Sequence, residues 1–267
     1  RYMNTNLRFV QQFAFVLLAT IVTGCASIDY DYPRDDSYAL EDTQDTYLGR
    51  QLADERAAHP GESGFYPILD GKDSLALRLL MAERAEKTID AQHFLIYNDI
   101  VGKAFANALL KAANRGVRVR FLLDDILSKG LDPGLAALNS HPNVEVRIFS
   151  PLNHRSARAL NIGQYDRMTR RMHNKSFTVD YQAALLGGRN IGDEYFQADA
   201  AVVYSDLDFP KIGRVVKKVS KGFDLDWNDE LSYPAIALRG EPPTPEEIKR
   251  ERGELDDYVS QQENSPY

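Results

Sequence analysis

The amino-acid sequence predicts an α/β fold in which a mainly parallel sheet is flanked by helices. Segments with helical spacing of apolar residues alternate with short β-rich segments, as in chains built from βαβ units. Of the 267 residues, 43% are hydrophobic and 10% aromatic, which is the balance of an ordinary globular protein rather than a disordered one. This length is sufficient for one or two domains with a substantial buried core.

The amino-terminal half of the chain shows helix and strand signals in turn. Asp73 is a suitable N-cap because Leu75 and Leu79 follow it at helical spacing. Gly116 is placed to end a second helix, and Pro133 suits the first turn of a third. The expected elements are a helix from about 73, a strand over 88–97, a helix over 101–114, a strand over 117–123, a helix from 132 and a strand over 144–149.

The carboxyl-terminal half continues the alternation and then becomes acidic. From Glu241 onward the composition favours a solvated surface helix or tail, with Thr244 as a suitable N-cap and Pro245 at the first helical position. The expected elements before this tail are strands over 173–179 and 183–186, a short helix over 188–195, a strand over 206–212 and a helix that ends near 227.

The chain begins with a segment typical of secretion. Arg8 precedes an apolar run, Phe13–Val22, that is too short to cross a bilayer as a helix. The run leads into Val22-Thr23-Gly24-Cys25, which resembles a bacterial lipobox, in which the cysteine is diacylated and becomes the mature amino terminus. We therefore expect residues 1–24 to be a lipoprotein signal peptide and Cys25 to be the lipidation site. A non-cleaved membrane anchor, or a plain signal peptide with a chance cysteine, is the alternative.

One short segment carries the strongest chemical signal. His173, Lys175 and Asp180 have the spacing His-x-Lys-x4-Asp, and Gly187-Gly188-Arg189-Asn190 follows shortly after. This combination resembles the HKD signature of the phospholipase D superfamily. The resemblance implies an enzyme that attacks phosphodiesters through a histidine nucleophile at His173.

The residue types of this segment suit an anionic phosphodiester. Side chains two residues apart on a strand share a face, so His173 and Lys175 should project together. The Lys175 ammonium would offset the phosphate charge and the charge that develops in the transition state, while a neutral His173 imidazole attacks phosphorus. Asn190 would donate to a phosphate oxygen, and Gly187 and Gly188 would let the backbone approach the substrate closely.

The carboxylates near the motif have different expected roles. Asp180 lies seven residues after His173, on the opposite face or beyond the strand end, so we assign it a scaffold role within the catalytic set. An imidazole nucleophile also needs an acceptor for its second ring nitrogen. The family resemblance implies that this acid comes from a later strand. Asp206 is the best match, and Asp208, which shares its face by alternation, is the alternative.

The net charge of the chain is negative, whereas one segment of it is strongly basic. The chain has 32 Lys and Arg against 39 Asp and Glu, a net charge of −7, which argues against a dedicated nucleic-acid binder. In contrast, seven bases and one acid occur from Arg147 to Lys175. We expect Arg170 and Arg171 to bind substrate, because such a stretch would attract anionic phospholipid head groups. A solvated loop that balances nearby acids is the alternative.

The remaining histidines do not indicate a metal site. His93 falls on a presumed core strand, where a satisfied buried histidine is the expected state. His59, His141 and His154 lie in predicted loops without the spacing of metal ligands. We therefore expect no metal and no cofactor.

Most of the chain, from Asp42 to about Pro234, resembles bacterial phospholipase D-family lipoproteins close to the cardiolipin synthase C type. This resemblance implies a mixed sheet flanked by helices. It also implies phosphatidyl transfer, in which phosphatidylglycerol donates its phosphatidyl group to the enzyme and a second phospholipid or water accepts it. The stretches that carry the resemblance are 45–50, 63–67, 69–71, 115–125, 170–176 and 188–196.

Members of this type carry two such motifs, and the resemblance implies that the second histidine protonates the leaving alcohol. This sequence contains one. A truncated product is our preferred interpretation, and a homodimer with one motif from each copy is the alternative. Two other functions are compatible with the sequence: a homodimeric endonuclease of the same superfamily, and an inactive half-domain that binds lipid or a partner chain.

The expected organisation follows from these observations. Residues 1–24 are the signal peptide, 25–64 a tether and lead-in segment, 65–234 the phospholipase D-like catalytic half-domain, and 235–267 an acidic helical or disordered tail that starts a missing second half. The expected partners are anionic phospholipids and the membrane surface, without nucleic acid. Ala26 and Ser27 follow Cys25, and by resemblance to lipoprotein sorting rules this favours the outer membrane, on the periplasmic side of a bacterial envelope.

Overall fold

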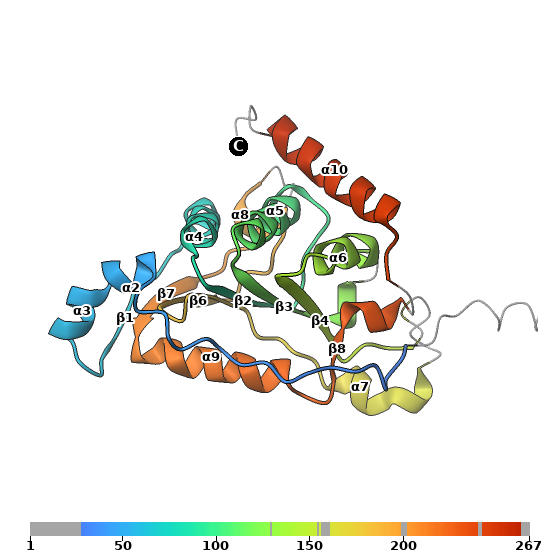
Figure 1. The fold of residues 1–267 in the computed structure, drawn as a ribbon, viewed down its shortest axis with the longest axis horizontal. Coiled ribbons are helices and arrows are strands. Elements are labelled where there is room, and N and C mark those ends of the chain that lie inside the picture. Colours follow the sequence, from blue (N-terminus) through green and yellow to red (C-terminus); the bar gives the residue numbers. More distant parts are fainter. Residues whose placement is uncertain are drawn as a thin grey trace, which may run out of the picture.

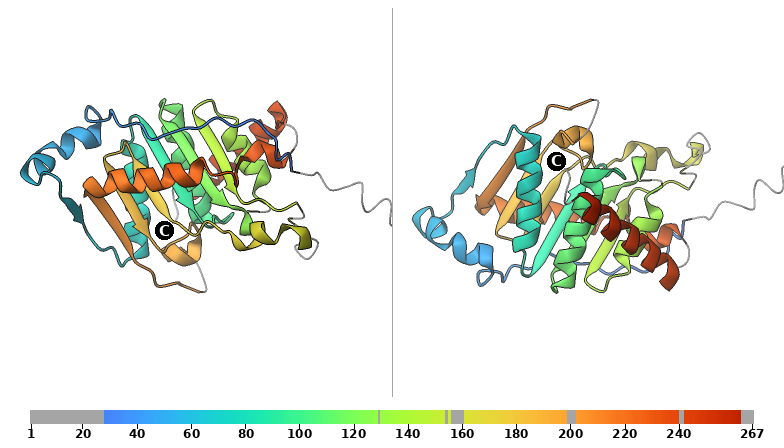
Figure 2. Two further views of the ribbon diagram at one scale, coloured as in Figure 1. Left: turned by 90° about the horizontal axis from the view of Figure 1, so that it is seen from below. Right: turned by 90° about the horizontal axis from the view of Figure 1, so that it is seen from above.

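The computed structural model describes residues 28–128, 130–153, 155, 161–198, 202–239 and 242–262. The predicted signal peptide and Cys25 lie outside these residues. In the described part of the chain one eight-stranded sheet has the order β1-β7-β6-β5-β2-β3-β4-β8. Helices α4, α5, α6, α8 and α10 cover one face and α9 covers the other (Figures 1 and 2). The strands are β1 Ser63–Phe65, β2 Thr88–His93, β3 Arg118–Asp124, β4 Val144–Phe149, β5 Ser176–Val179, β6 Ala183–Gly187, β7 Asp208–Gly213 and β8 Ser232–Pro234.

The centre of the sheet is built from the βαβ units that the sequence predicts. Strand β2 pairs with β3, and β3 with β4, in parallel. Helices α5 (Ile100–Asn114) and α6 (Asp132–Asn139) make the connections. Asp99 caps α5 by accepting a hydrogen bond from the Gly102 amide at 2.8 Å, and Gly116 adopts a φ of +96° after the helix ends.

The prediction of a mainly parallel sheet is wrong outside this centre, because the other five strand pairs are antiparallel. Between β5 and β6 the cause is a two-residue turn at Asp180 and Tyr181, whose φ angles are 50° and 54°. The Gln182 amide closes the turn by donating to the Val179 carbonyl at 3.0 Å. Positive φ at both central residues defines a type I′ turn, which joins antiparallel strands.

Side-chain caps set the starts of two further helices. Helix α4 (Gly71–Arg84) begins earlier than predicted, because Asp70 rather than Asp73 caps it. Helix α10 (Pro245–Gln262) begins at the predicted Thr244 cap: the Glu247 amide donates to the Thr244 hydroxyl at 3.2 Å, and the Thr244 amide donates to the Glu247 carboxylate at 2.8 Å. The other helices are α2 Tyr47–Gln51, α3 Ala53–Ala58, α7 Tyr165–Thr169, α8 Asp193–Phe196, α9 Arg214–Trp227 and the 3₁₀ turns η1 Asp125–Leu127, η3 Ile162–Gln164 and η4 Ala235–Leu238. No helix among the described residues combines the length and apolar character needed to cross a bilayer.

The two faces of the sheet differ in chemistry. The face under α4, α5 and α6 is apolar, with residues such as Ile89 and Phe121 fully buried. On the α9 face, fully buried Arg120 pairs with Asp90 at 2.7 Å and with Asp224 at 2.8 Å, and its guanidinium lies 4.8 Å from the centroid of the Phe223 ring. Burying this cation is tolerable because two carboxylates and an aromatic face surround it.

Residues 28–46, for which the sequence predicts a tether, instead lie along the α9 face (Figure 2). The Ser37 carbonyl accepts from Arg120 at 2.7 Å, and the Ala39 amide donates to Asp224 at 3.1 Å. The Asp35 carbonyl accepts from Arg147 at 2.7 Å. Buried arginines therefore hold this segment as a strap, and it belongs to the folded domain.

Candidate active site

The loop of residues 170–175 lies beyond the carboxyl end of β2, because Ser176, the first residue of β5, pairs with Gln92 near the end of β2. Asp124, the last residue of β3, holds this loop from one side. Its carboxylate accepts from the Met172 amide at 2.9 Å. Met172 itself is buried, so the main chain before His173 is fixed at the carboxyl edge of the central strands.

Asp226 of α9 holds the loop from the other side. Its Oδ2 atom accepts from the side-chain amide of Asn174 at 2.8 Å and from that of Gln92 at 2.6 Å. Gln92 also accepts from the Ser176 hydroxyl at 3.3 Å. These bonds connect Asn174, the residue after His173, with β2, β5 and α9.

The structure brings His173 and Lys175 together, although both precede β5 and the strand predicted from residue 173 begins only at Ser176. Nζ of Lys175 lies 3.3 Å from Nε2 of His173 and donates to the His173 carbonyl at 3.0 Å. A charged ammonium only donates hydrogen bonds, so the contact places the lone pair of the ring on Nε2 and the proton on Nδ1. Nε2 is therefore the atom suited to attack.

The two side chains differ in their environment. His173 is exposed, whereas Lys175 is buried. Burial lowers the pKa of Lys175, and the negative charge of Asp206 acts in the opposite direction. Phe94, directly after β2, packs edge-on against the imidazole with ring centroids 4.6 Å apart. Sequence reasoning missed Phe94; its position at the end of a core strand was the available signal.

Asn190 lies in the segment after β6, beside the Phe94 segment, because the Ile191 amide donates to the Leu95 carbonyl at 3.2 Å. It is buried, and its Nδ2 donates to the Tyr195 hydroxyl at 2.8 Å. Its Oδ1 has no hydrogen-bond partner among the described residues. The two ends of an Asn amide exchange by rotation. One end is therefore free to meet a ligand such as a phosphate oxygen.

Gly187 and Gly188 make room for carboxylates, which differs from the predicted approach of backbone to substrate. A Cβ atom on Gly188 would lie 2.0 Å from Oδ1 of Asp206, and one on Gly187 would lie 1.6 Å from Oδ1 of Asp208. The two glycines thus set where the two candidate orienting acids lie.

The surroundings of Asp206 and Asp208 separate their roles. Asp208 is fully buried, and its Oδ2 accepts from Arg78 and Arg189, each at 3.1 Å, and from the Ser74 hydroxyl. It is committed to this internal ion cluster. Asp206 is partly exposed, and its charge influences the pKa of Lys175. Its carboxylate makes no hydrogen bond to His173 in the described structure.

Asp180 is fully buried in the β5–β6 turn. Its carboxylate accepts from three consecutive backbone amides, those of Glu86, Lys87 and Thr88, with distances down to 2.8 Å. These bonds tie the turn to the start of β2. The geometry is that of a scaffold carboxylate remote from phosphate chemistry.

Most of the basic side chains in the segment from Arg147 to Lys175 pair with acidic side chains of the fold. This contradicts the expectation of a cationic loop beside the nucleophile. Arg171 is paired with buried Asp124, so its guanidinium is not free to bind substrate, and exposed Arg170 is flanked by two acids. Arg167 stacks on the rings of Tyr30 and Tyr233. Arg158 and His154 lie outside the described residues. The acidic partners are Glu145 for Arg147, Asp125 and Asp132 for Arg155, Asp229 and Glu230 for Arg170, and Asp124 for Arg171.

His93 is buried, as expected, but not satisfied. Neither of its ring nitrogens has a hydrogen-bond partner among the described residues, and the ring packs on Phe105 with centroids 5.5 Å apart. Burial lowers its pKa well below the ordinary value, and the charges of Arg78 and Lys175 lower it further. The imidazole is therefore neutral in the folded protein.

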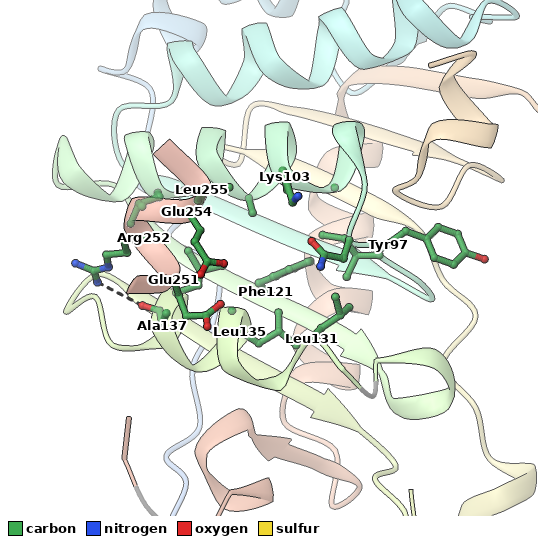
Figure 3. A pocket seen from close by; sticks show the side chains of 17 residues that line it. Tyr97, Lys103, Phe121, Leu131, Leu135, Ala137, Glu251, Arg252, Glu254 and Leu255 are labelled. Carbon is green, nitrogen blue, oxygen red and sulfur yellow. Dashed lines mark hydrogen bonds between the residues drawn. The ribbon is translucent and has the colours of Figure 1, made fainter. Parts of the chain in front are cut away.

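A cavity of about 190 Å³ lies between α5, α6 and α10 (Figure 3). Phe121 and Leu135 form part of its apolar wall, and Glu251 and Glu254 of α10 face Lys103 of α5 across it. Its lining does not include His173 or Lys175. The pair belongs to the 170–175 loop at the carboxyl ends of the central strands, outside this cavity.

Comparison with known proteins identifies relatives over much of the chain. The family described as "Cardiolipin synthase, PLD-like domain" matches residues 79–227. Cardiolipin synthase C of Escherichia coli (strain K12) is 49% identical over 170 residues, which are 63% of this chain and 36% of that protein. An uncharacterized protein of Helicobacter pylori (strain ATCC 700392 / 26695) is 36% identical over 233 residues, 85% of this chain and 46% of that protein. This chain therefore spans less than half the length of these relatives.

Solved structures agree on the fold. Phosphatidylserine synthase of Haemophilus influenzae Rd KW20 superposes with a TM-score of 0.51 at 15% identity, covering 74% of this chain and 43% of that chain. The match to the family extends from the second half of α4 to the end of α9 and so includes the sheet centre, the His173 loop and Asp206. This chain belongs to the phospholipase D-like family described as cardiolipin synthase, PLD-like domain.

Proposed function

We propose that this chain performs phospholipase D-type chemistry on phospholipids, with His173 as the nucleophile, in a cardiolipin synthase-like phosphatidyl transfer. The observation that carries the proposal is the 3.3 Å contact between Lys175 Nζ and His173 Nε2. It places a cation beside an imidazole lone pair at an exposed position, which suits attack on a negatively charged phosphorus centre. Family membership and the name of the Escherichia coli relative support phospholipid as the substrate class.

In the first step Nε2 of His173 attacks the phosphorus of a phospholipid such as phosphatidylglycerol. An N–P bond forms, the P–O bond to the leaving alcohol breaks, and that oxygen takes a proton from a general acid. The ammonium of Lys175 stabilises the charge on the phosphoryl oxygens, and Asn190 donates to one of them. In the proposed reaction the Asp206 carboxylate accepts a hydrogen bond from the Nδ1–H group of His173 and keeps the ring oriented.

In the second step the hydroxyl of an acceptor attacks phosphorus, its proton passes to the same acid–base group, and the N–P bond breaks. A phospholipid acceptor yields cardiolipin, and water yields phosphatidic acid. The partners of His173 among the described residues are Lys175 and Phe94, so we propose that the acid–base group comes from a second half or from His173 of a second copy. Lipidation of Cys25 would hold the chain at the periplasmic side of a bacterial membrane, with the outer membrane favoured.

The test uses the full chain, at a concentration where it self-associates, with radiolabelled phosphatidylglycerol. We expect cardiolipin or phosphatidic acid and a labelled phosphohistidine. His173→Ala should abolish both, and Lys175→Ala should lower turnover by about 10²–10³-fold, the usual cost of losing one electrostatic stabiliser. His59→Ala is the matched control, because His59 is an exposed histidine outside the site.

Two results would overturn the proposal. One is the absence of any lipid product and of phosphohistidine from the associated wild-type chain. The other is a His173→Ala variant that keeps the turnover of the His59→Ala control. Cleavage of DNA that weakens steeply with salt would instead assign the chain to the nuclease branch.

A further inference from the structure

We infer that the outer face of α7, formed by Tyr165 and Met168, is the surface by which this chain lies on a lipid bilayer. Tyr165 is 71% exposed and Met168 is 39% exposed. Residues three apart on a helix share a face, so both side chains present apolar surface on one side of α7. Tyrosine, with an apolar ring and a polar tip, suits the level of lipid head groups. The inference rests on the proposed function and its lipid anchor.

The inner face of α7 is fastened to the start of the described chain. The Arg167 guanidinium lies 4.2 Å from the centroid of the Tyr30 ring, and Gln164, directly before α7, donates to the Tyr30 hydroxyl at 3.1 Å. Arg167 also donates to the Tyr233 hydroxyl at 3.1 Å. The side of α7 that carries Arg167 is thus occupied by the protein, and the side that carries Tyr165 and Met168 is open.

The position of Ile28, the first described residue, would bring a bilayer that is anchored through Cys25 to this exposed side of α7. Ile28 is buried, and the Asp29 amide donates to the Ala237 carbonyl at 3.2 Å, so the chain is held in the fold from Ile28 onward. Cys25 is three residues earlier, and three residues reach at most about 11 Å. Acyl chains on Cys25 would hold the bilayer next to the end of the molecule where α7 lies (Figures 1 and 2).

The same surface is connected rigidly to the reaction centre. The Ser150 hydroxyl, at the end of β4, donates to the Arg167 carbonyl at 2.9 Å. Arg171, two residues before His173, donates to the same carbonyl at 3.2 Å and pairs with buried Asp124. A bilayer in contact with α7 therefore lies at a fixed position relative to the exposed imidazole.

Apolar contact rather than charge should dominate this binding. Arg170, the exposed base beside α7, is paired with Asp229 at 3.7 Å and with Glu230 at 3.2 Å. Asp166 adds a further negative charge within α7. Binding to vesicles should therefore depend little on the salt concentration, in contrast to binding by a polybasic segment.

The first test measures depth in the bilayer and needs no catalysis. Met168→Cys, Leu225→Cys and Tyr66→Cys are labelled separately with a fluorophore in the full chain and bound to phosphatidylglycerol–phosphatidylethanolamine vesicles that carry a lipid-linked quencher. Leu225 and Tyr66 are matched controls, 67% and 68% exposed, on α9 and beside β1. The parent chain, treated identically, reports any label on Cys25. We expect at least about threefold stronger quenching at position 168 than at either control. Equal quenching at 168 and 225, or stronger quenching at 66, overturns the inference.

The second test separates the inference from the proposed function. The double variant Tyr165→Ser/Met168→Ser should lose about tenfold in turnover on vesicles, as expected when two apolar contacts with the bilayer are removed, and keep wild-type turnover on phosphatidylglycerol dissolved in detergent. Leu225→Ser should change neither. Wild-type turnover of the double variant on vesicles would overturn the inference. A chain that is inactive on both substrates but quenched at position 168 would refute the proposed function and leave the bilayer surface standing.

Discussion

Asp208→Asn should destabilise the fold strongly. The substitution removes the negative charge of the side chain and leaves its volume almost unchanged, so the loss of stability reports on the charge. Arg78 and Arg189 have side chains only 2% exposed, and Asp208 is their sole acidic partner among the described residues. Removing one partner of a buried ion pair leaves an uncompensated charge and costs about 3–5 kcal/mol. Unfolding free energies are about 5–15 kcal/mol, so the loss is a large fraction of the total. It corresponds to a fall in Tm of roughly 6–20 °C for a domain of this size.

The assay is urea unfolding followed by circular dichroism, with two comparison variants. Asp206→Asn alters a partly exposed carboxylate and should stay within about 0.5 kcal/mol of wild type in unfolding free energy, while turnover should fall because the variant lacks the orienting acid proposed for His173. Arg78→Met leaves Arg189 and Asp208 as a one-to-one pair and should therefore cost less than Asp208→Asn. An unfolding free energy of Asp208→Asn within about 1 kcal/mol of wild type, or a larger loss in Asp206→Asn than in Asp208→Asn, would show that Asp208 does not compensate the two buried arginines.

Two further predictions concern His93 and the glycine pair. The pKa of His93 in the folded protein lies below its ordinary 6.5, so on acidification the unfolded chain binds a proton before the folded one does. The free energy of unfolding should therefore fall below about pH 6.5, by up to about 1.4 kcal/mol per pH unit. Urea unfolding at pH 7.5 and 5.5 should show this loss in wild type and in His59→Gln, a control at an exposed histidine. The loss should be smaller in His93→Leu. Equal losses in all three proteins would contradict the role assigned to His93. Gly188→Ala should push aside the Asp206 carboxylate and lower turnover with little change in Tm. Gly187→Ala presses on buried Asp208 and should cost about 1–3 kcal/mol; the reverse pattern would show that the two acids have the opposite roles.

Local signals predicted the centre of the sheet well and its outer strands poorly. Strand β4 spans the predicted residues 144–149, and α5 begins one residue before the prediction, because caps and periodicity are properties of neighbouring residues. Strand direction after β4 depends on where the chain returns to the sheet. The two-residue turn at Asp180 and Tyr181 decides this for β6, and a tyrosine at positive φ gives no turn signal that a sequence pattern would reveal.

The candidate site likewise has features that the sequence predicts and features that it does not. The closeness of His173 and Lys175 was predictable from their spacing, and it holds even though neither is in a strand. The roles of Arg171 and Asp208 were not predictable, because their partners are distant in sequence: Asp124 precedes Arg171 by 47 residues, and Arg78 precedes Asp208 by 130. A count of bases along the chain cannot show which of them are already neutralised within the fold.

The exposure of His173 bears directly on which product the proposed reaction gives. A phosphohistidine open to solvent is attacked by water, because water is far more concentrated than any lipid hydroxyl, and the product is phosphatidic acid. Transfer to a second phospholipid requires that water be excluded from the intermediate. The described residues supply Phe94 beside the imidazole and Lys175 next to Nε2, which leaves the solvent side of the ring uncovered. We propose that the surface which covers this side also supplies the proton for the leaving oxygen. The ratio of cardiolipin to phosphatidic acid would then measure how completely a second half or a second copy closes over His173.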